Sequence, residues 1–192
     1  IVPDNVTLIG ERAFQGCTNL KTLTFPASYK AETLSFGLTP FVSCPAFEGY
    51  VIEDGASIVR TEDGTLLAGG GKVLVSLPQD FKGTSYTVPD GVETISDYLF
   101  YKNTTITSVT LPASLKKIGT AAFQGCTKLT SIALPDGFIT LGEHAFDGCS
   151  GLKTVTFGQS LTAVPAYAFS NCSALTAVDL PATVETVGDY AF

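Results

Sequence analysis

Residues 123–145 read FQGCTKLTSIALPDGFITLGEHA, and variants of this line precede and follow it in steps of 23 residues. Each copy begins with a phenylalanine, which fixes the step: Phe100, Phe123, Phe146, Phe169 and Phe192. A constant period of about 20–50 residues is typical of repeat proteins, in which each unit is one turn of a coil. The sequence therefore predicts a stack of 23-residue coils.

Two apolar segments give each coil its arms. Ile132 and Leu134 alternate with a small residue, and this period of two predicts a short strand. Pro135 ends the strand because proline has no amide hydrogen to donate to a ladder. Phe138 and Leu141 predict a second inward-facing arm. Glycines after this arm are expected to allow a sharp corner: Gly119, Gly142 and Gly188. Stacked units share one core, with each strand about 4.8 Å above the last.

The period loosens toward the N-terminus. We interpret residues 27–40 as irregular and residues 54–88 as a long repeat. The long repeat is expected to contain a β-hairpin that protrudes around Asp63-Gly64 and the triple glycine at 69–71. Residues 1–192 are predicted to form a single solenoid domain. Because the chain opens and closes partway through a repeat, we expect it to be a fragment of a protein that continues on both sides.

The cysteines all occupy one place in the repeat, three residues after the phenylalanine: Cys17, Cys44, Cys126, Cys149 and Cys172. Asn103 takes this place in another coil. A position that accepts Cys or Asn favours a small group that hydrogen-bonds to turning backbone. An odd number in a regular column argues against disulfides. We expect free, buried thiols and no metal site, since no second ligand type accompanies them.

The combined pattern, I-G-x-x-A-F-x-x-C-x-x-L-x-x-V-x-L-P-x-x-V-x-x-I-G, resembles the BspA-type leucine-rich repeat, a class abundant on bacterial surfaces and in some surface proteins of parasitic protists. The resemblance covers nearly the whole chain. It departs at Asn103, at Gly158 in place of the strand-ending proline and at Pro165 in place of glycine. It implies a β-rich leucine-rich-repeat solenoid, a curved right-handed stack whose L-x-x-V-x-L strands line the concave side.

The outward residues of these strands form the candidate ligand-binding face, which is small, hydroxyl-rich and nearly uncharged: Thr22, Thr24, Ser108, Thr110, Ser131, Thr154, Thr156 and Asp179. Threonine also suits an ordinary solvated strand. The surface is therefore either plain solvated sheet or a shallow face for a protein or glycan, as extended solenoid surfaces often are.

A second candidate column stands two residues before the repeat phenylalanine and contains Tyr98, Tyr167 and Tyr190. These rings either pack against neighbouring turns or form a strip on which sugars stack. His144, the only histidine, shares the column. Without a second histidine, a catalytic triad or a metal-histidine site has little to build on.

Charge and hydropathy narrow the classes of partner. The formal net charge is −7, the pI is about 4.5 and the eleven Lys and Arg are scattered, which argues against nucleic acid and anionic membranes. No apolar run approaches the roughly 18 residues of a membrane span, so we expect no membrane insertion of this segment. No cofactor is expected.

The resemblance to BspA-type repeats implies a non-enzymatic protein-binding or adhesion module of a bacterial cell-surface or secreted protein. The expected location is extracellular, and the expected partners are host or neighbouring-cell proteins, with glycans as a second class. One alternative is a structural spacer that presents other domains. Another is a glycan-binding or glycan-processing β-solenoid; processing would need clustered carboxylates, whereas the strand face offers only Asp179.

Overall fold

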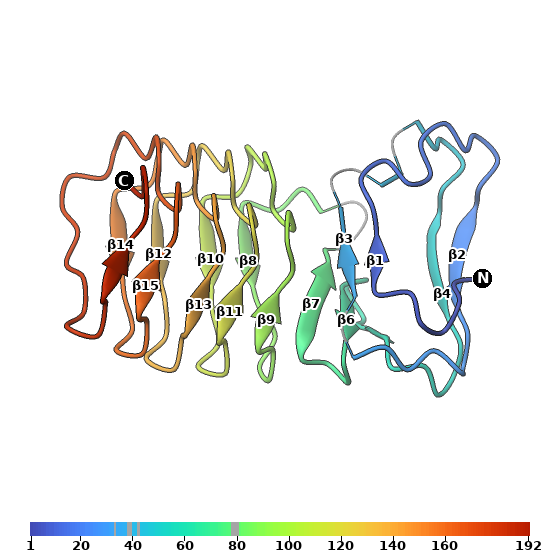
Figure 1. Ribbon diagram of the computed structural model, residues 1–192. Coiled ribbons are helices and arrows are strands. Elements are labelled where there is room, and N and C mark those ends of the chain that lie inside the picture. The colour runs from blue at the N-terminus through green and yellow to red at the C-terminus, as the bar shows by residue number, and fades with distance from the viewer. Residues whose placement is uncertain (33, 38–39, 42, 78–80) are drawn as a thin grey trace. The chain divides into compact units, whose positions relative to one another are not determined.

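The computed structural model describes residues 1–32, 34–37, 40–41, 43–77 and 81–192. In this part of the chain the regular structure is a helix-free β-solenoid built from short strands. The chain divides into two compact units, unit 1 (Ile1–Phe81) and unit 2 (Lys82–Phe192). Figure 1 shows the strands of both units. A single domain over residues 1–192 stays a prediction.

Unit 2 contains the regular coils. Its first sheet has four parallel strands in the order β14-β12-β10-β8: β8 (Ser85–Thr87), β10 (Ser108–Thr110), β12 (Ser131–Ala133) and β14 (Thr154–Thr156). Ser131 lies opposite Ser108 on one side and Thr154 on the other. The 23-residue period of the sequence is therefore the register of this sheet.

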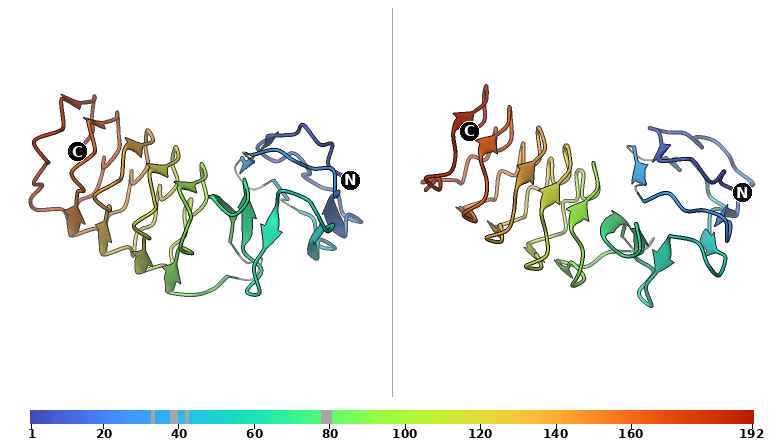
Figure 2. Two further views of the ribbon diagram at one scale, coloured as in Figure 1. Left: turned by 90° about the horizontal axis from the view of Figure 1, so that it is seen from below. Right: turned by 60° about the horizontal axis from the view of Figure 1, so that its bottom comes forward.

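The second arm of each coil forms its own row of parallel strands. Strand β11 (Lys117–Ile118) pairs with β9 (Thr94–Ile95) and β13 (Thr140–Leu141), and β15 (Ala163–Val164) pairs with β16 (Thr186–Val187). In Figures 1 and 2 the two rows of strands run along the same stack of coils. The predicted pair of arms is confirmed for the coils that contain β8, β10, β12 and β14.

The core of unit 2 is a ladder of stacked phenylalanines. The ring centroids of Phe100 and Phe123 lie 4.7 Å apart, and those of Phe123 and Phe146 lie 5.0 Å apart, with nearly parallel planes. The inward residues of both arms pack around these rings and are buried: Leu129, Ile132, Leu134, Phe138 and Leu141. Each coil thus shares its apolar surface with the coils before and after it.

The cysteines are all free thiols, as predicted. Cys126, Cys149 and Cys172 are buried, and Cys44 is half-buried. The expectation of a buried thiol is wrong for Cys17, which is exposed. The buried thiols contact the phenylalanine carbonyl of the preceding coil, whereas no side-chain partner is found for Cys17 among the described residues.

Asn103 fulfils a different backbone role at the same place. Its Oδ1 accepts hydrogen bonds from the amides of Thr105 and Ile106, each at 3.0 Å. The side chain therefore holds its own turn, whereas the buried cysteines bond to the coil before theirs.

The corner of each coil is not turned by the glycine, which corrects our expectation. Gly142 has no positive φ; instead, an added Cβ would lie 2.5 Å from the carbonyl carbon of Gly119. Glycine is needed there because two coils approach closely. The left-handed residue comes two positions later, with φ values of 51° at Ala121, 55° at His144 and 57° at Tyr167.

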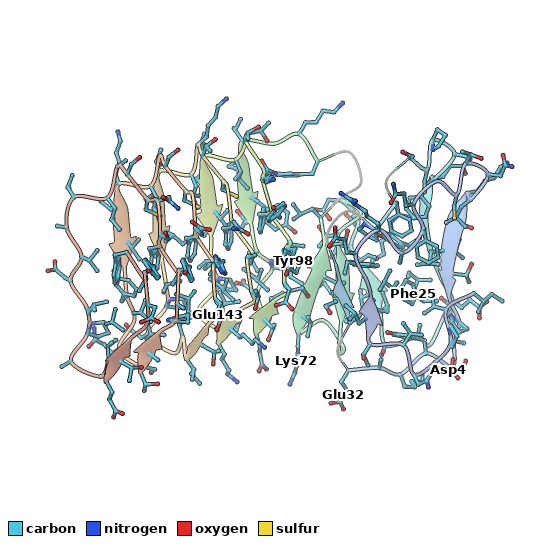
Figure 3. The ribbon with its side chains drawn as sticks, turned by 45° about the horizontal axis from the view of Figure 1, so that its top comes forward. Asp4, Phe25, Glu32, Lys72, Tyr98 and Glu143 are labelled. Carbon is cyan, nitrogen blue, oxygen red and sulfur yellow. The ribbon has the colours of Figure 1, made fainter. Side chains whose placement is uncertain are left out.

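Unit 1 begins with two less regular coils. Strand β1 (Leu8–Ile9) pairs in parallel with β3 (Ser35–Phe36), and β2 (Thr22–Phe25) pairs in parallel with β4 (Gly49–Ile52). The fully buried Phe25 lies inside the unit, as Figure 3 shows. The stretch predicted as irregular, 27–40, contains β3, while its residues 33 and 38–39 lie outside the described part.

The long repeat forms three antiparallel strands rather than one protruding hairpin. They are β5 (Val59–Arg60), β6 (Leu66–Ala68) and β7 (Val73–Ser76). The turns between them contain Asp63-Gly64 and the triple glycine. The middle strand is buried throughout because its Leu-Leu-Ala sequence is apolar on both faces. Residues 78–80 of the predicted insertion lie outside the described part.

Candidate functional site

The first sheet of unit 2 presents a row of small outward side chains, which we call the strand face. In β10, Ser108 and Thr110 are exposed while Val109 between them is buried, and β8 and β12 share this pattern. The face comprises the outward residues of the four strands: Ser85, Thr87, Ser108, Thr110, Ser131, Ala133, Thr154 and Thr156. The strand register aligns them in two columns.

Hydroxyl groups of two kinds occur near this face. Just before the strands, the Thr107 hydroxyl donates to the Thr84 carbonyl at 2.8 Å, and the Thr130 hydroxyl donates to the Thr107 carbonyl at 3.2 Å. In contrast, no partner within the described ranges is found for the strand-face hydroxyls of Thr110 and Thr156. The first kind joins coils, whereas the second is available to water or to a ligand.

The structure brings together five of the eight predicted face residues: Ser108, Thr110, Ser131, Thr154 and Thr156. Thr22 and Thr24 belong to β2 of unit 1. Asp179 is exposed and lies outside any strand. Our prediction missed Ser85 and Thr87, although each stands 23 residues before a predicted member and is paired with it.

The aromatic column of the corner is a second stack. The rings of His144 and Tyr167 lie 4.6 Å apart, and those of Tyr167 and Tyr190 lie 5.0 Å apart, with nearly parallel planes. Both faces of the Tyr167 ring are therefore covered. Tyr98 is separated from this stack by Ala121 and instead meets Tyr101 edge to face at 6.0 Å.

Asp147 accepts hydrogen bonds from the coils before and after its own at the same corner. Its carboxylate accepts from Gln124 Nε2 at 2.8 Å and Asn171 Nδ2 at 3.0 Å, and its Oδ2 lies 3.2 Å from His144 Nδ1. Burial raises the pKa of Asp147, but the hydrogen bonds from Asn171, His144 and Gln124 favour the ionised form and bring the pKa below its ordinary value. Because side chains of neighbouring coils donate these hydrogen bonds, the Asp147 carboxylate links the coils to one another.

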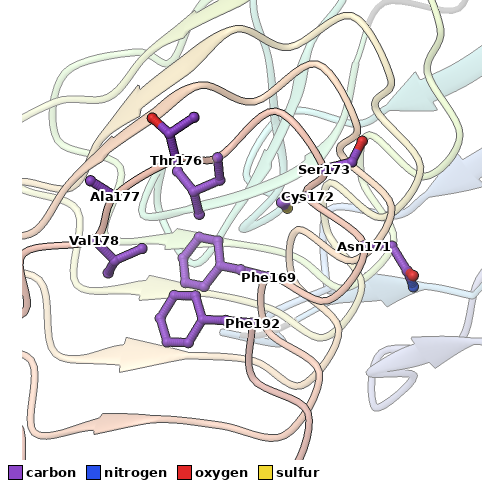
Figure 4. A pocket seen from close by; sticks show the side chains of 9 residues that line it. Phe169, Asn171, Cys172, Ser173, Thr176, Ala177, Val178 and Phe192 are labelled. Atoms are coloured by element: carbon purple, nitrogen blue, oxygen red, sulfur yellow. The ribbon is translucent and has the colours of Figure 1, made fainter.

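Each unit has a hollow on its surface that is lined by described residues. One, of about 410 Å³, lies in unit 2 beside the stacked rings of Phe169 and Phe192 and is also lined by Cys172 and Val178, as Figure 4 shows. Residues 176–180 form no strand here. The other, also about 410 Å³, lies in unit 1 beside β4 and β5, near Tyr50 and Arg60.

Metal and membrane features can be stated for the described residues. They contain no group of three or more His, Cys, Asp or Glu placed to hold a metal ion. They also contain no helix long and apolar enough to cross a membrane.

The model of the BspA type leucine-rich repeat region matches residues 1–59 and 79–192, in six copies. The chain belongs to this family. Leucine-rich repeat families are non-enzymatic in kind, and their members generally bind other proteins. The unmatched residues between the two segments include β6 and β7 of the long repeat. No curated protein matches this BspA-type chain.

Solved structures share the fold of this BspA-type chain. A leucine-rich cell surface protein of Faecalibacterium prausnitzii is 27% identical with a TM-score of 0.54, over 99% of this chain and 43% of that one. A leucine-rich repeat protein of Bacteroides ovatus is 25% identical with a TM-score of 0.51, over 100% and 56%. The pneumococcal vaccine antigen PcpA is 22% identical with a TM-score of 0.53, over 95% and 54%. The chain thus spans about half the length of these proteins.

Proposed function

We propose that this chain is a non-enzymatic protein-binding module of a bacterial cell-surface or secreted protein, located outside the cell. It engages host or neighbouring-cell proteins through the strand face of unit 2. The family supports a protein-interaction role, and the Faecalibacterium relative is a cell surface protein.

The observation that carries this proposal is the set of exposed strand-face hydroxyls for which the described residues supply no partner. A ligand that covers them must replace the water they now bind, because a buried polar group left unpaired costs about 1–3 kcal/mol. A protein surface with backbone and side-chain donors and acceptors meets this need. Burial of Val109 and Ile132 beneath the face holds the hydroxyls in fixed positions.

The test is binding of the purified chain to an array of extracellular-matrix proteins and glycans. A Thr110→Gln/Thr156→Gln variant places longer, uncharged side chains on the strand face. Its matched control, Thr140→Gln/Thr186→Gln, makes the same change at exposed threonines of β13 and β16. Circular dichroism and thermal melting establish that both variants keep the fold.

A protein bound saturably by the unmodified chain and the control, but at least about tenfold more weakly by the face variant, supports the proposal. No saturable protein ligand for the unmodified chain would favour the structural spacer. Equal losses of affinity in both variants would indicate that the binding surface lies elsewhere. Binding only to glycans would favour the glycan-binding alternative.

A further inference from the structure

The edge of the strand face where the strands begin, which we call the entry edge, carries lysines and no acidic residue. The segments leading into the four strands are 82–84, 104–107, 127–130 and 150–153, and they contain no Asp or Glu. They contain three exposed lysines: Lys82, Lys128 and Lys153. In contrast, Asp90 and Asp136 follow the ends of β8 and β12.

The entry-edge lysines carry uncompensated charge. Lys116 of the second arm forms an ion pair with Glu93 at 2.9 Å. No acidic partner is found within the described ranges for Lys82, Lys128 or Lys153. Their ammonium groups are therefore available, in a chain whose net charge of −7 would otherwise repel an anionic partner.

The repeat sets the spacing of these charges. Lys82 stands three residues before β8 and Lys128 three residues before β12, two coils further on, which places them about 10 Å apart along the stack. Lys153 directly precedes β14, one coil and about 5 Å beyond Lys128. An extended peptide spaces alternate side chains by about 6.6 Å, so flexible lysines can meet several of its carboxylates.

We infer that the entry edge of unit 2 docks an extended, acidic segment of a partner protein, which runs along the stack and contacts Lys82, Lys128 and Lys153. This inference rests on the proposed function and names the chemistry of the partner. The carboxylates face the lysines, while the neighbouring residues of the partner lie over the strand-face hydroxyls. Coulomb attraction of exposed charges acts within about 10 Å at 0.1 M salt, so the lysines next to the docked segment act on it most strongly.

The experiment measures fluorescence anisotropy of a labelled peptide of alternating glutamate and threonine, mixed with the full chain at low salt. A peptide of alternating glutamine and threonine serves as the uncharged probe. The test variant is Lys128→Gln/Lys153→Gln. The control variant, Lys116→Gln/Lys117→Gln, removes the same charge from the second arm of the same unit. Heparin is titrated separately as a sulfated-glycan probe.

We expect the glutamate peptide to bind the unmodified chain, and the glutamine peptide to bind at least about tenfold more weakly. Raising the salt concentration from about 0.05 M to about 0.5 M should lower the affinity of the chain for the glutamate peptide about tenfold. The entry-edge variant should lose about tenfold in affinity, while the control should stay within about twofold.

The inference is overturned if the glutamate peptide does not bind, if the glutamine peptide binds equally well, or if both variants lose the same affinity. Heparin binding without peptide binding also overturns it and assigns the edge to a glycan. A third outcome is a protein from the array whose binding is lost in the Thr110→Gln/Thr156→Gln variant but kept in the Lys128→Gln/Lys153→Gln variant. This result overturns the inference about the entry edge and leaves the proposed function standing.

Discussion

The Cys149 thiol lies 3.1 Å from the backbone oxygen of Phe123, in the coil before its own, and donates a hydrogen bond to it. Cys126 and Cys172 repeat this contact with Phe100 and Phe146. A hydrogen bond with the Cys126 thiol and burial raise the pKa of Cys149 well above its usual range, and burial raises that of Cys172 to about 12. The thiols of Cys149 and Cys172 therefore stay protonated at neutral pH.

Thiol labelling should follow this ladder. Because their thiols are buried, Cys126, Cys149 and Cys172 should resist a maleimide reagent at about pH 8 in the folded chain, whereas the exposed Cys17 should react. Mass spectrometry of digested protein reads each site, and labelling in denaturant gives the full signal. Rapid modification of Cys149 in the folded chain would contradict the ladder.

Removal of one rung of the phenylalanine ladder should be costly. Phe146 is fully buried and stacks between Phe123 at 5.0 Å and Phe169 at 5.2 Å. Phe146→Ala should lower the free energy of unfolding by about 3–5 kcal/mol in a urea titration, through lost burial and a cavity. Phe192 is 49% exposed, so Phe192→Ala should cost clearly less. Equal costs would show that the ring stack contributes little.

Alanine substitutions at two glycines should test the close approach of neighbouring coils. At Gly142 an added Cβ would lie 2.5 Å from the Gly119 carbonyl carbon, whereas at Gly137 it would lie 3.9 Å from the Ala113 carbonyl oxygen, at ordinary contact distance. Gly142→Ala should therefore destabilise the chain by about 1–3 kcal/mol, because the clash is with backbone. Gly137→Ala should be nearly neutral. Thermal melting of the pair would refute the close approach if both variants melted alike.

The Asp147 network should make stability depend on pH in the acidic range. The pKa of Asp147 is lowered from 3.8 in the folded chain, so the ionised carboxylate stabilises the fold above that value. This contribution is lost as the pH falls below about 3.8, through the folded pKa. The stability difference between the unmodified chain and Asp147→Asn should therefore narrow between about pH 6 and about pH 3.

Urea titrations at the two pH values measure this narrowing, and the exposed Asp136 provides the control, Asp136→Asn. A difference for Asp147→Asn that stays constant over the range would mean that the carboxylate is not held by Gln124 and Asn171 in solution.

Much of the fold follows from the sequence because the repeat imposes one geometry on every coil. The spacing of Ile132 and Leu134 predicts both the strand and its buried face, and the period predicts the register. The long repeat was predicted less well, since the apolar run Leu66–Ala68 is compatible with either a protruding strand or a buried one. Only packing against the rest of unit 1 distinguishes the two.

The candidate site, too, was predicted from the sequence only in part. Periodicity placed Ser108 and Thr156 on one face. It could not show which hydroxyls donate hydrogen bonds to backbone carbonyls, as that of Thr107 does. It also assigned the corner to Gly142, whereas the left-handed conformation lies at His144. Such details depend on the distances between coils, which a spacing of residue types does not contain.

The most direct test of the proposed function is a photo-crosslink from the centre of the strand face to a bound protein. A benzophenone-bearing residue replaces the exposed Ala133 of β12 or, as the control, the exposed Thr140 of β13. After irradiation with a saturable protein ligand from the array, we predict a covalent adduct from position 133 and none from position 140. An adduct from position 140 alone, or from neither position, would contradict binding at the strand face.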